Sequence, residues 1–153
     1  MSLGLALHRL GYRIAYRGLR LYWFVFRPAT SGVKCLLTDG DRVLLVRHTY
    51  GDRRWDLPGG TLRSGEHPEQ TARREMAEEL GVELGELTHL GALQVRVDHR
   101  RDRLHCFRAE LPRAALTLDL AELSAAQWFR RDQLPDQLAR FVRPILGRAR
   151  LGP

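Results

Sequence analysis

The spacing of apolar residues along the chain predicts an alternation of helices and strands. Near the N-terminus, leucine and isoleucine recur every three or four residues, a period typical of an amphipathic helix, here over residues 3–26. Ala72, Met76 and Leu80 recur with the same period and predict a second helix from Pro68 to Leu80. The glutamates of this second helix lie to one side of its apolar face, so we expect them outside the core.

Short aliphatic runs predict the strands. Val33–Thr38 and Val43–Val46 are joined by Asp39-Gly40-Asp41, whose Asp-Gly pair is a hairpin signal. Because a helix lies between pairs of strands, the pattern indicates an α/β fold with a mixed sheet and helices on its faces. The remaining expected elements are strands over Leu87–Val97, Leu104–Leu111 and Ala125–Phe129, a charged turn over 98–102, and a final helix from Asp136 to Ala149 that bends at Pro144.

The excess positive charge of the chain lies at its two ends. The 153 residues fit one domain, and the net charge is +7. Five arginines and no acids lie in residues 1–30, and four arginines and no acids lie in residues 140–153. The rest therefore holds 16 basic against 18 acidic groups, a slightly acidic centre. This distribution argues against a nucleic-acid-binding face and suits ends that contact a membrane surface, a polyanion or a partner subunit.

The cysteines and the apolar runs bear on where in the cell the protein is expected. Cys35 and Cys106 lie far apart in apolar runs, without the spacing of a zinc site or a disulfide framework, so a reduced, cytoplasmic chain is expected. The longest apolar run, Leu21–Phe26, is far shorter than the roughly 20 residues of a membrane span. No signal-peptide pattern is present at the start.

Three glutamates of the predicted second helix form the strongest chemical signal. At about 100° per residue, Glu75, Glu78 and Glu79 fall within roughly a third of the helix circumference. Like charges this close repel one another, and a divalent cation with a preference for oxygen ligands, Mg²⁺ or Mn²⁺, would offset that repulsion. Gly59-Gly60, shortly before the helix, allows the backbone to approach a ligand closely.

The segment from Gly60 to Val82 matches the pattern G-x5-E-x7-R-E-U-x-E-E-x-G-U, in which U is a bulky aliphatic residue. All nine fixed places are filled, and chance gives such a match on the order of once in a billion windows. The chain therefore resembles a Nudix hydrolase, and the likeness covers residues of about 31–136. Further similar stretches are Trp55-Asp56-Leu57-Pro58-Gly59-Gly60, Glu122, Gln127-Trp128-Phe129 and Leu134-Pro135.

This resemblance implies a fold and a reaction. The fold would be a Nudix-type α/β/α sandwich with a mixed central sheet over residues 31–153, preceded by an extra basic amphipathic helix over residues 1–30. The reaction would be the attack of water on a diphosphate linkage, assisted by Mg²⁺ or Mn²⁺. The implied metal ligands are Glu75, Glu78, Glu79 and the Gly60 carbonyl; Arg74 would orient the glutamates, and Glu66 would tie the preceding loop to the helix.

Other roles stay open at this stage. Glu122 is the first candidate for the general base, with Glu78 as its competitor. An arginine in a turn can bind phosphate or simply be solvated. A tryptophan can stack on a nucleobase or pack in the core. The candidate substrate-binding residues are Arg53, Arg54, Trp55 and Arg100.

We expect hydrolysis of a nucleoside diphosphate derivative or a nucleoside triphosphate, with a non-catalytic nucleotide-binding or regulatory domain as the alternative. Subfamilies specific for ADP-ribose tend to have a proline, and those for diadenosine polyphosphates a tyrosine, some sixteen residues beyond the box. The chain has neither near Val97, and the coenzyme A pattern is absent as well. The expected partner is a small diphosphate substrate and not nucleic acid. A homodimer built on the N-terminal helix is favoured over peripheral membrane contact.

Overall fold

The computed structural model describes residues 29–97, 100–112 and 116–150, together with Gly11, Ile14, Ala15 and Gly18, which are helical. The rest of the amphipathic helix expected over residues 3–26 lies outside the described residues. In chain order the elements are β1 (Ala29–Asp39), β2 (Arg42–His48), β3 (Trp55–Asp56), α2 (Pro68–Leu80), β4 (Thr88–Val97), β5 (Arg100–Glu110), β6 (Leu123–Arg130) and α3 (Val142–Arg148).

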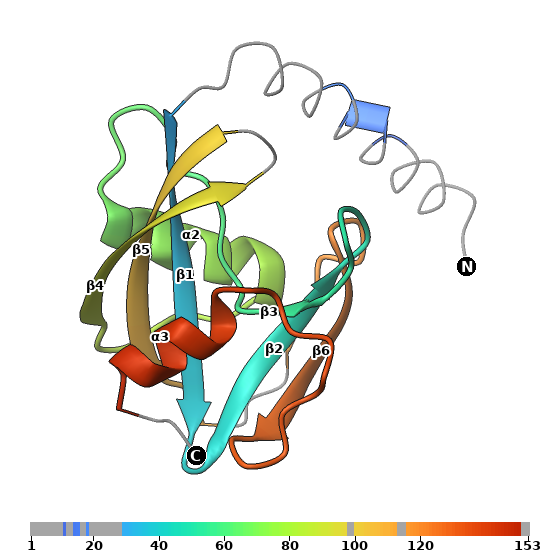
Figure 1. Cartoon of the computed structure of the whole chain (residues 1–153), viewed down its shortest axis with the longest axis vertical. Coiled ribbons are helices and arrows are strands. Elements are labelled where there is room, and N and C mark those ends of the chain that lie inside the picture. The colour runs from blue at the N-terminus through green and yellow to red at the C-terminus, as the bar shows by residue number, and fades with distance from the viewer. Residues whose placement is uncertain are drawn as a thin grey trace.

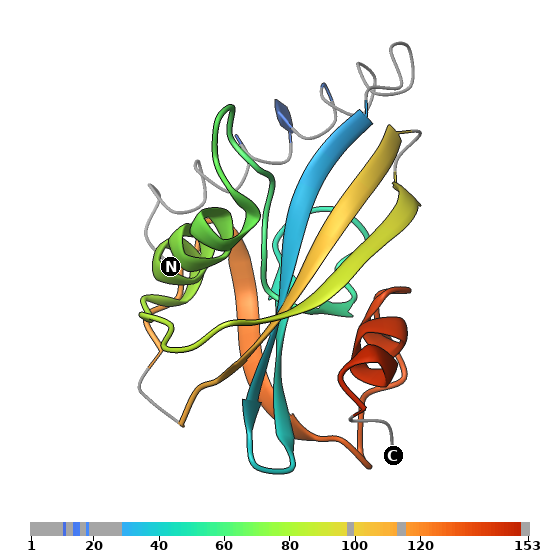
Figure 2. The same ribbon diagram turned by 90° about the vertical axis from the view of Figure 1, so that its left-hand side faces the viewer.

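The strands form one six-stranded mixed sheet with the order β3-β2-β1-β5-β4, and β6 pairs with β2 (Figure 1). β1 runs parallel to β5, whereas the other pairs are antiparallel. The α2 helix covers one face of this sheet and α3 the other, as Figure 2 shows. The α/β/α sandwich and its mixed sheet are thereby confirmed.

Each helix closes a separate apolar layer. Alternate residues of a strand point to opposite faces, so Cys35 and Leu37 of β1 join the core under α2, while Leu36 joins the core under α3. The α2 core includes Met76 and Leu80. The α3 core includes Trp55, Leu57, Val142 and Ile145.

The β1–β2 hairpin is confirmed, but its two strands soon separate. They pair only at Thr38 with Val43 and at Asp39 with Arg42, next to the turn. The segment after β3 takes up the free edge of β1, where Val33 and Cys35 donate backbone hydrogen bonds to the carbonyls of Gly60 and Pro58 at 2.8 and 2.9 Å. This splayed hairpin places the Gly59-Gly60 turn inside the sheet.

The α2 helix begins and ends where the sequence predicts. Pro68 occupies the first turn after His67, whose backbone N–H donates to the Gln70 side chain at 3.0 Å. Gly81 ends the helix in a left-handed conformation, with φ of 67°.

The prediction of the final helix was wrong in its start and in its bend. Residues 137–139 extend beside β3 instead, since Trp55 exchanges backbone hydrogen bonds with Gln137 and Ala139 at 2.8 and 2.7 Å. The α3 helix therefore begins at Val142, which places Pro144 in its first turn, where a missing N–H costs no helical hydrogen bond.

The strand boundaries differ less. β5 already begins at Arg100, so the expected turn over 98–102 is shorter than predicted. Both cysteines are buried and form no disulfide. None of the helices in the described part of the chain has the length and apolar character that a membrane span requires.

Candidate active site

The candidate site lies where α2 packs against the Gly59-Gly60 turn. The Glu75 carboxylate lies directly over Gly60, in the space that a Cβ atom there would fill. Gly59 has φ of 148° and lies so close to the Val33 carbonyl that no Cβ would fit. The two glycines therefore bring backbone and carboxylates into direct contact, as the sequence led us to expect.

Glu79 is buried, with 3% of its surface exposed, which corrects the expectation that the glutamates lie outside the core. Its Oε2 accepts a hydrogen bond from the Gly59 N–H at 3.3 Å. Burial raises the pKa of Glu79 to about 8; the charges of Glu75 and Glu122 add to this shift, whereas Lys34 and the Gly59 bond oppose it. Burial therefore favours the protonated acid, and the ionised carboxylate is stabilised only where a positive charge compensates it.

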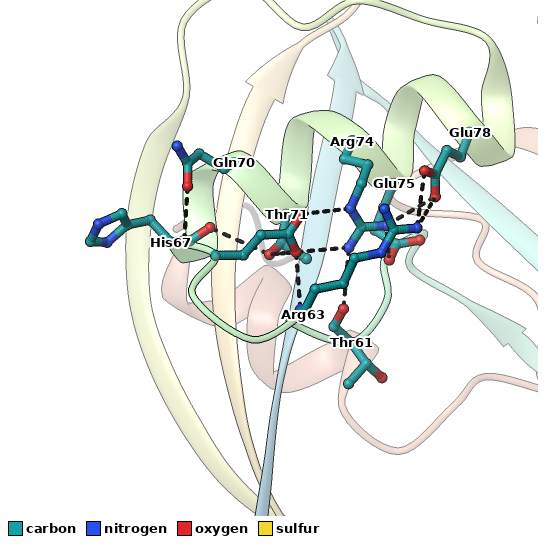
Figure 3. A network of polar contacts seen from close by, with 9 residues as sticks. Thr61, Arg63, His67, Gln70, Thr71, Arg74, Glu75 and Glu78 are labelled. Atoms are coloured by element: carbon teal, nitrogen blue, oxygen red, sulfur yellow. Dashed lines mark hydrogen bonds and ion pairs between the residues drawn. The ribbon is translucent and has the colours of Figure 1, made fainter.

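Arg74 joins three glutamates in one network (Figure 3). It forms a bidentate pair with Glu66, Nε to Oε1 at 2.7 Å and Nη2 to Oε2 at 2.9 Å. Its Nη1 donates to Glu75 Oε1 at 2.8 Å and to Glu78 Oε2 at 2.9 Å. These charge-assisted bonds raise the pKa of Arg74 and are the contacts that the expected orienting role requires.

Glu66 links the loop before α2 to the helix itself. Besides Arg74, its Oε2 accepts the Arg63 backbone N–H at 3.0 Å and the Thr71 hydroxyl at 2.9 Å (Figure 3). The hydrogen bonds, that of Arg74 first, hold the pKa of Glu66 down to about 2. Arg63 reaches Glu78 as well, from Nη2 to Oε1 at 3.2 Å. Glu66 thus has the contacts expected of a residue that fastens the loop.

Glu75 and Glu122 extend the cluster toward β6. Burial raises the pKa of Glu75 against the lowering effect of Arg74, and the charges of Glu78 and Glu122 add to the rise. The Glu122 backbone carbonyl accepts a hydrogen bond from the Thr49 N–H at 2.8 Å, which fixes the start of β6 beside the end of β2. The structure therefore brings Glu122 close enough to Glu75 and Glu79 for their charges to interact.

The donor set suits a hard divalent cation. The available ligands are carboxylate oxygens and the Gly60 carbonyl, which accepts one hydrogen bond from the Val33 N–H and has a second lone pair to offer. In the described residues no three His, Cys, Asp or Glu side chains yet converge as a preformed cation site. Because Arg74 holds Glu75 and Glu78 in its hydrogen bonds, metal binding would involve a rearrangement of these carboxylates.

The candidate substrate-binding residues occupy different settings. Arg53 and Arg54 are exposed in the loop before β3, and Arg54 forms an ion pair with Asp52, Nε to Oδ2 at 3.5 Å. Trp55 is only 8% exposed and contributes to the α3 core. Arg100 opens β5, and its side chain lies outside the described residues.

Two basic residues near the site were not identified from the sequence. Lys34 is buried and donates from Nζ to Asp56 Oδ2 and to the Leu57 carbonyl, both at 2.8 Å, which fastens the start of the glycine turn from the α3 side. The Cζ atom of Arg47 lies 4.5 Å from the centre of the Trp55 ring. Lys34 lies within the aliphatic run of β1, and Arg47 directly follows that of β2. A basic residue at such a position is the sequence feature that could have identified them.

Comparison with known proteins places this geometry in a family. The family model described as "NUDIX domain" matches residues 28–148. An NAD-capped RNA hydrolase, NudC, of Pseudomonas aeruginosa is 34% identical over 101 residues, 65% of this chain and 36% of that protein. An ADP-ribose pyrophosphatase of Mycobacterium tuberculosis is 55% identical over 42 residues, 27% of this chain and 20% of that protein.

A solved structure agrees over most of the described chain. The NUDIX domain of Shewanella oneidensis NrtR, crystallised with ADP ribose, superposes with a TM-score of 0.69 at 25% identity and covers 82% of this chain and 89% of that one. The curated relatives are longer, since the chain spans 36% of the NudC protein and 20% of the pyrophosphatase.

Proposed function

The chain belongs to the Nudix hydrolase family, and on this premise we propose that it hydrolyses a diphosphate linkage in a nucleotide derivative with the help of Mg²⁺ or Mn²⁺. The observation that carries the proposal is the contact of the α2 carboxylates with the Gly59-Gly60 turn, with Glu79 buried among them. A domain that only bound nucleotide would gain nothing from this costly cluster of like charges.

The ligands that would hold the metal are Glu75, Glu78, Glu79 and the Gly60 carbonyl. When bound, a divalent cation neutralises diphosphate charge and makes water more acidic. Before a cation binds, Arg74 compensates the charges of Glu75 and Glu78 and keeps them next to each other, because one guanidinium nitrogen donates to both. Glu66 fixes Arg74 in turn, so the loop and the helix act as one support.

The proton of the attacking water needs an acceptor. Glu122 fits this role best, because its charge acts on Glu75 and Glu79 and yet it comes from the turn just before β6 and not from the helix that would hold the metal. Glu78 remains the alternative, since its side chain is half exposed, at 50%, and so within reach of water.

For the substrate, we propose a nucleoside diphosphate joined to a second group rather than a nucleoside triphosphate. The names of the two curated relatives, an NAD-capped RNA hydrolase and an ADP-ribose pyrophosphatase, and the ADP ribose in the NrtR structure share this chemistry. The chain lacks the proline associated with ADP-ribose specificity, so the second group is left open within this class.

The test is an assay of purified protein on NAD⁺, NADH, ADP-ribose, a UDP-sugar and the nucleoside triphosphates, with Mg²⁺ or Mn²⁺ and with EDTA. We expect metal-dependent release of a nucleoside monophosphate from at least one of the diphosphate-linked compounds, at higher kcat/KM than for any triphosphate. Binding of these compounds without turnover in either metal would favour the non-catalytic alternative.

A further inference from the structure

The side chain of Arg63 covers a carboxylate that the proposed function assigns to the metal. Its Nη2 atom donates to both oxygens of Glu78, to Oε1 at 3.2 Å and to Oε2 at 3.4 Å. Arg63 belongs to the loop before α2, whereas Glu78 lies near the end of that helix. The pattern from Gly60 to Val82 leaves the place of Arg63 open to any residue, so the resemblance assigns it no role.

Glu78 also accepts a hydrogen bond from Arg74, and the two arginines differ in how firmly they are held (Figure 3). The Arg74 side chain is 16% exposed and also pairs with Glu66 and Glu75, at 2.7 and 2.8 Å. The Arg63 side chain is 63% exposed, and within the described residues its guanidinium bonds to Glu78 alone. An exposed ion pair contributes little free energy, so Arg63 can leave Glu78 at small cost while Arg74 stays.

The backbone of Arg63 is fixed, although its side chain is exposed. Its N–H donates to Glu66 Oε2 at 3.0 Å, and its carbonyl accepts the Glu66 N–H at the same distance. Glu66 in turn is bound to Arg74 and to the Thr71 hydroxyl. Because only the side chain is free to turn, a guanidinium released from Glu78 stays within a side chain's length of it.

A divalent cation and Arg63 would compete for the same two oxygens. A carboxylate oxygen that binds a cation has to give up lone pairs that now accept the guanidinium N–H groups. A cation on Glu78 would also repel the like charge of Arg63, which favours its release. An anion held by that cation would lie next to Glu78, within reach of the released guanidinium, and would offer it a new charge-assisted hydrogen bond.

We propose that Arg63 is an exchangeable counter-ion, which pairs with Glu78 in the metal-free protein and moves to the diphosphate of the substrate once a divalent cation occupies Glu78. This inference rests on the proposed function and deepens it, because it names a residue that couples the binding of the metal to the binding of the substrate. Arg63 suits the exchange since its charge is exposed, its backbone is anchored and Glu78 is the acceptor of its side chain.

The first experiment measures metal binding without substrate. Mn²⁺ is titrated by calorimetry into the full chain, freed of metal beforehand with EDTA. Arg63→Gln removes the competing charge, so we expect it to bind Mn²⁺ about 2- to 5-fold more tightly than the wild type. Arg73→Gln is the matched control, because it removes the same charge from another exposed ion pair, the one with Glu69, and should shift the affinity less.

The second experiment measures anion binding at saturating Mg²⁺. The probe is α,β-methylene-ADP, a nucleoside diphosphate whose bridge resists hydrolysis, with adenosine as the uncharged comparison. We expect Arg63→Gln to bind the probe about 3- to 10-fold more weakly and to leave adenosine unaffected. Arg63→Lys should stay close to the wild type in both experiments, because a single nitrogen makes the contact with Glu78. A thermal melt of each variant checks that the fold is retained.

The two shifts have opposite signs, which a loosened loop would not produce. An Mn²⁺ affinity that is unchanged in Arg63→Gln, or that rises equally in Arg73→Gln, overturns the exchange, and so does an unchanged probe affinity. If the wild type then still turns over a diphosphate-linked compound, the proposed function stands. If both shifts occur but the wild type hydrolyses nothing, the exchange stands and the function is wrong. A wild type that binds neither Mn²⁺ nor the probe overturns the exchange.

Discussion

Glu79 shows how one residue combines burial with charge. It stands next to Glu78 near the end of α2, where the sequence predicts an exposed position. Packing against the Gly59-Gly60 turn nevertheless leaves only 3% of its surface exposed. Burial and the neighbouring carboxylates raise its pKa to about 8. This single side chain therefore couples folding to pH.

The raised pKa of Glu79 predicts how metal-free stability depends on pH. The folded protein keeps a proton that the unfolded chain, with its ordinary pKa of 4.5, has released, so stability falls as the pH rises and the loss is complete above about 8. His48 acts in the opposite direction between about 3 and 6.5, which leaves the window from pH 6.5 to 8 to Glu79. In EDTA, Tm should fall across this window.

The control for this prediction is Glu79→Gln, which cannot ionise. Its Tm in EDTA should vary much less from pH 6.5 to 8, and added Mg²⁺ should reduce the fall in the wild type. If the variant shows the same slope as the wild type, another group is responsible.

Glu79→Gln should also abolish most of the activity. Glutamine keeps the shape and the hydrogen bond to Gly59 but removes the charge of the metal ligand that we propose, so we expect kcat to fall by about 100-fold or more, with the fold retained. Glu69→Gln on the same helix loses an exposed ion pair to Arg73 and should change little. A near-normal rate in Glu79→Gln would falsify its assignment as a metal ligand.

Replacement of Glu122 and Glu78 decides between the two candidate bases. If Glu122 accepts the proton from water, Glu122→Gln should lower kcat with little change in KM, because the loss is confined to the transition state. Steady-state kinetics on the best substrate measure this. An unchanged kcat in Glu122→Gln, together with an inactive Glu78→Gln, assigns the base to α2.

At the scale of elements, α2 is a rigid support for the site. Its apolar side packs on β1 and β5, and its polar side carries the carboxylates that meet the turn between β3 and α2. The helix ends at Gly81, whose left-handed backbone brings the chain back against Thr117. The length of α2 and the position of Glu79 therefore depend on this cap.

Gly81→Ala tests the importance of the cap. A Cβ there would meet the Thr117 Cβ at 2.8 Å, and φ of 67° is unfavourable for alanine, so we expect a loss of about 1–3 kcal/mol in the free energy of unfolding. Chemical denaturation measures the loss. Gly85→Ala, where a Cβ meets nothing within 4 Å, is the matched control and should stay close to the wild type.

At the scale of the whole molecule, the family domain leaves the N-terminal segment unexplained. The family model begins at residue 28, and the five arginines before it come without an acid. The apolar side of the helix expected there needs a cover, and we expect its own domain or a second subunit to provide it rather than a membrane.

Deletion of residues 1–27 tests this expectation. The shortened protein should aggregate or change its oligomeric state, because removal of the segment exposes apolar surface, and light scattering coupled to size exclusion measures the change. A shortened protein with unchanged behaviour and mass that has lost liposome binding would favour the membrane instead.

The sequence alone determined those features that depend on near neighbours in the chain. A period of three to four residues placed α2 from Pro68 to Leu80, with a glycine stop, and placed Glu75, Glu78 and Glu79 within one part of its circumference. The hairpin at Asp39-Gly40-Asp41 followed from local turn chemistry in the same way. The match from Gly60 to Val82 then indicated the family, and the comparisons confirmed it.

Tertiary structure alone decided the features that join distant segments. Helical spacing places Glu79 beside the core, but its burial depends on the Gly59 turn, twenty residues earlier, packing against it. The final helix was shortened because Trp55, eighty residues earlier, takes the backbone groups of Gln137 and Ala139. Arg47 likewise lies over Trp55 only because β2 and β3 pair. No local pattern encodes such contacts, since packing and hydrogen-bond competition across the fold decide them.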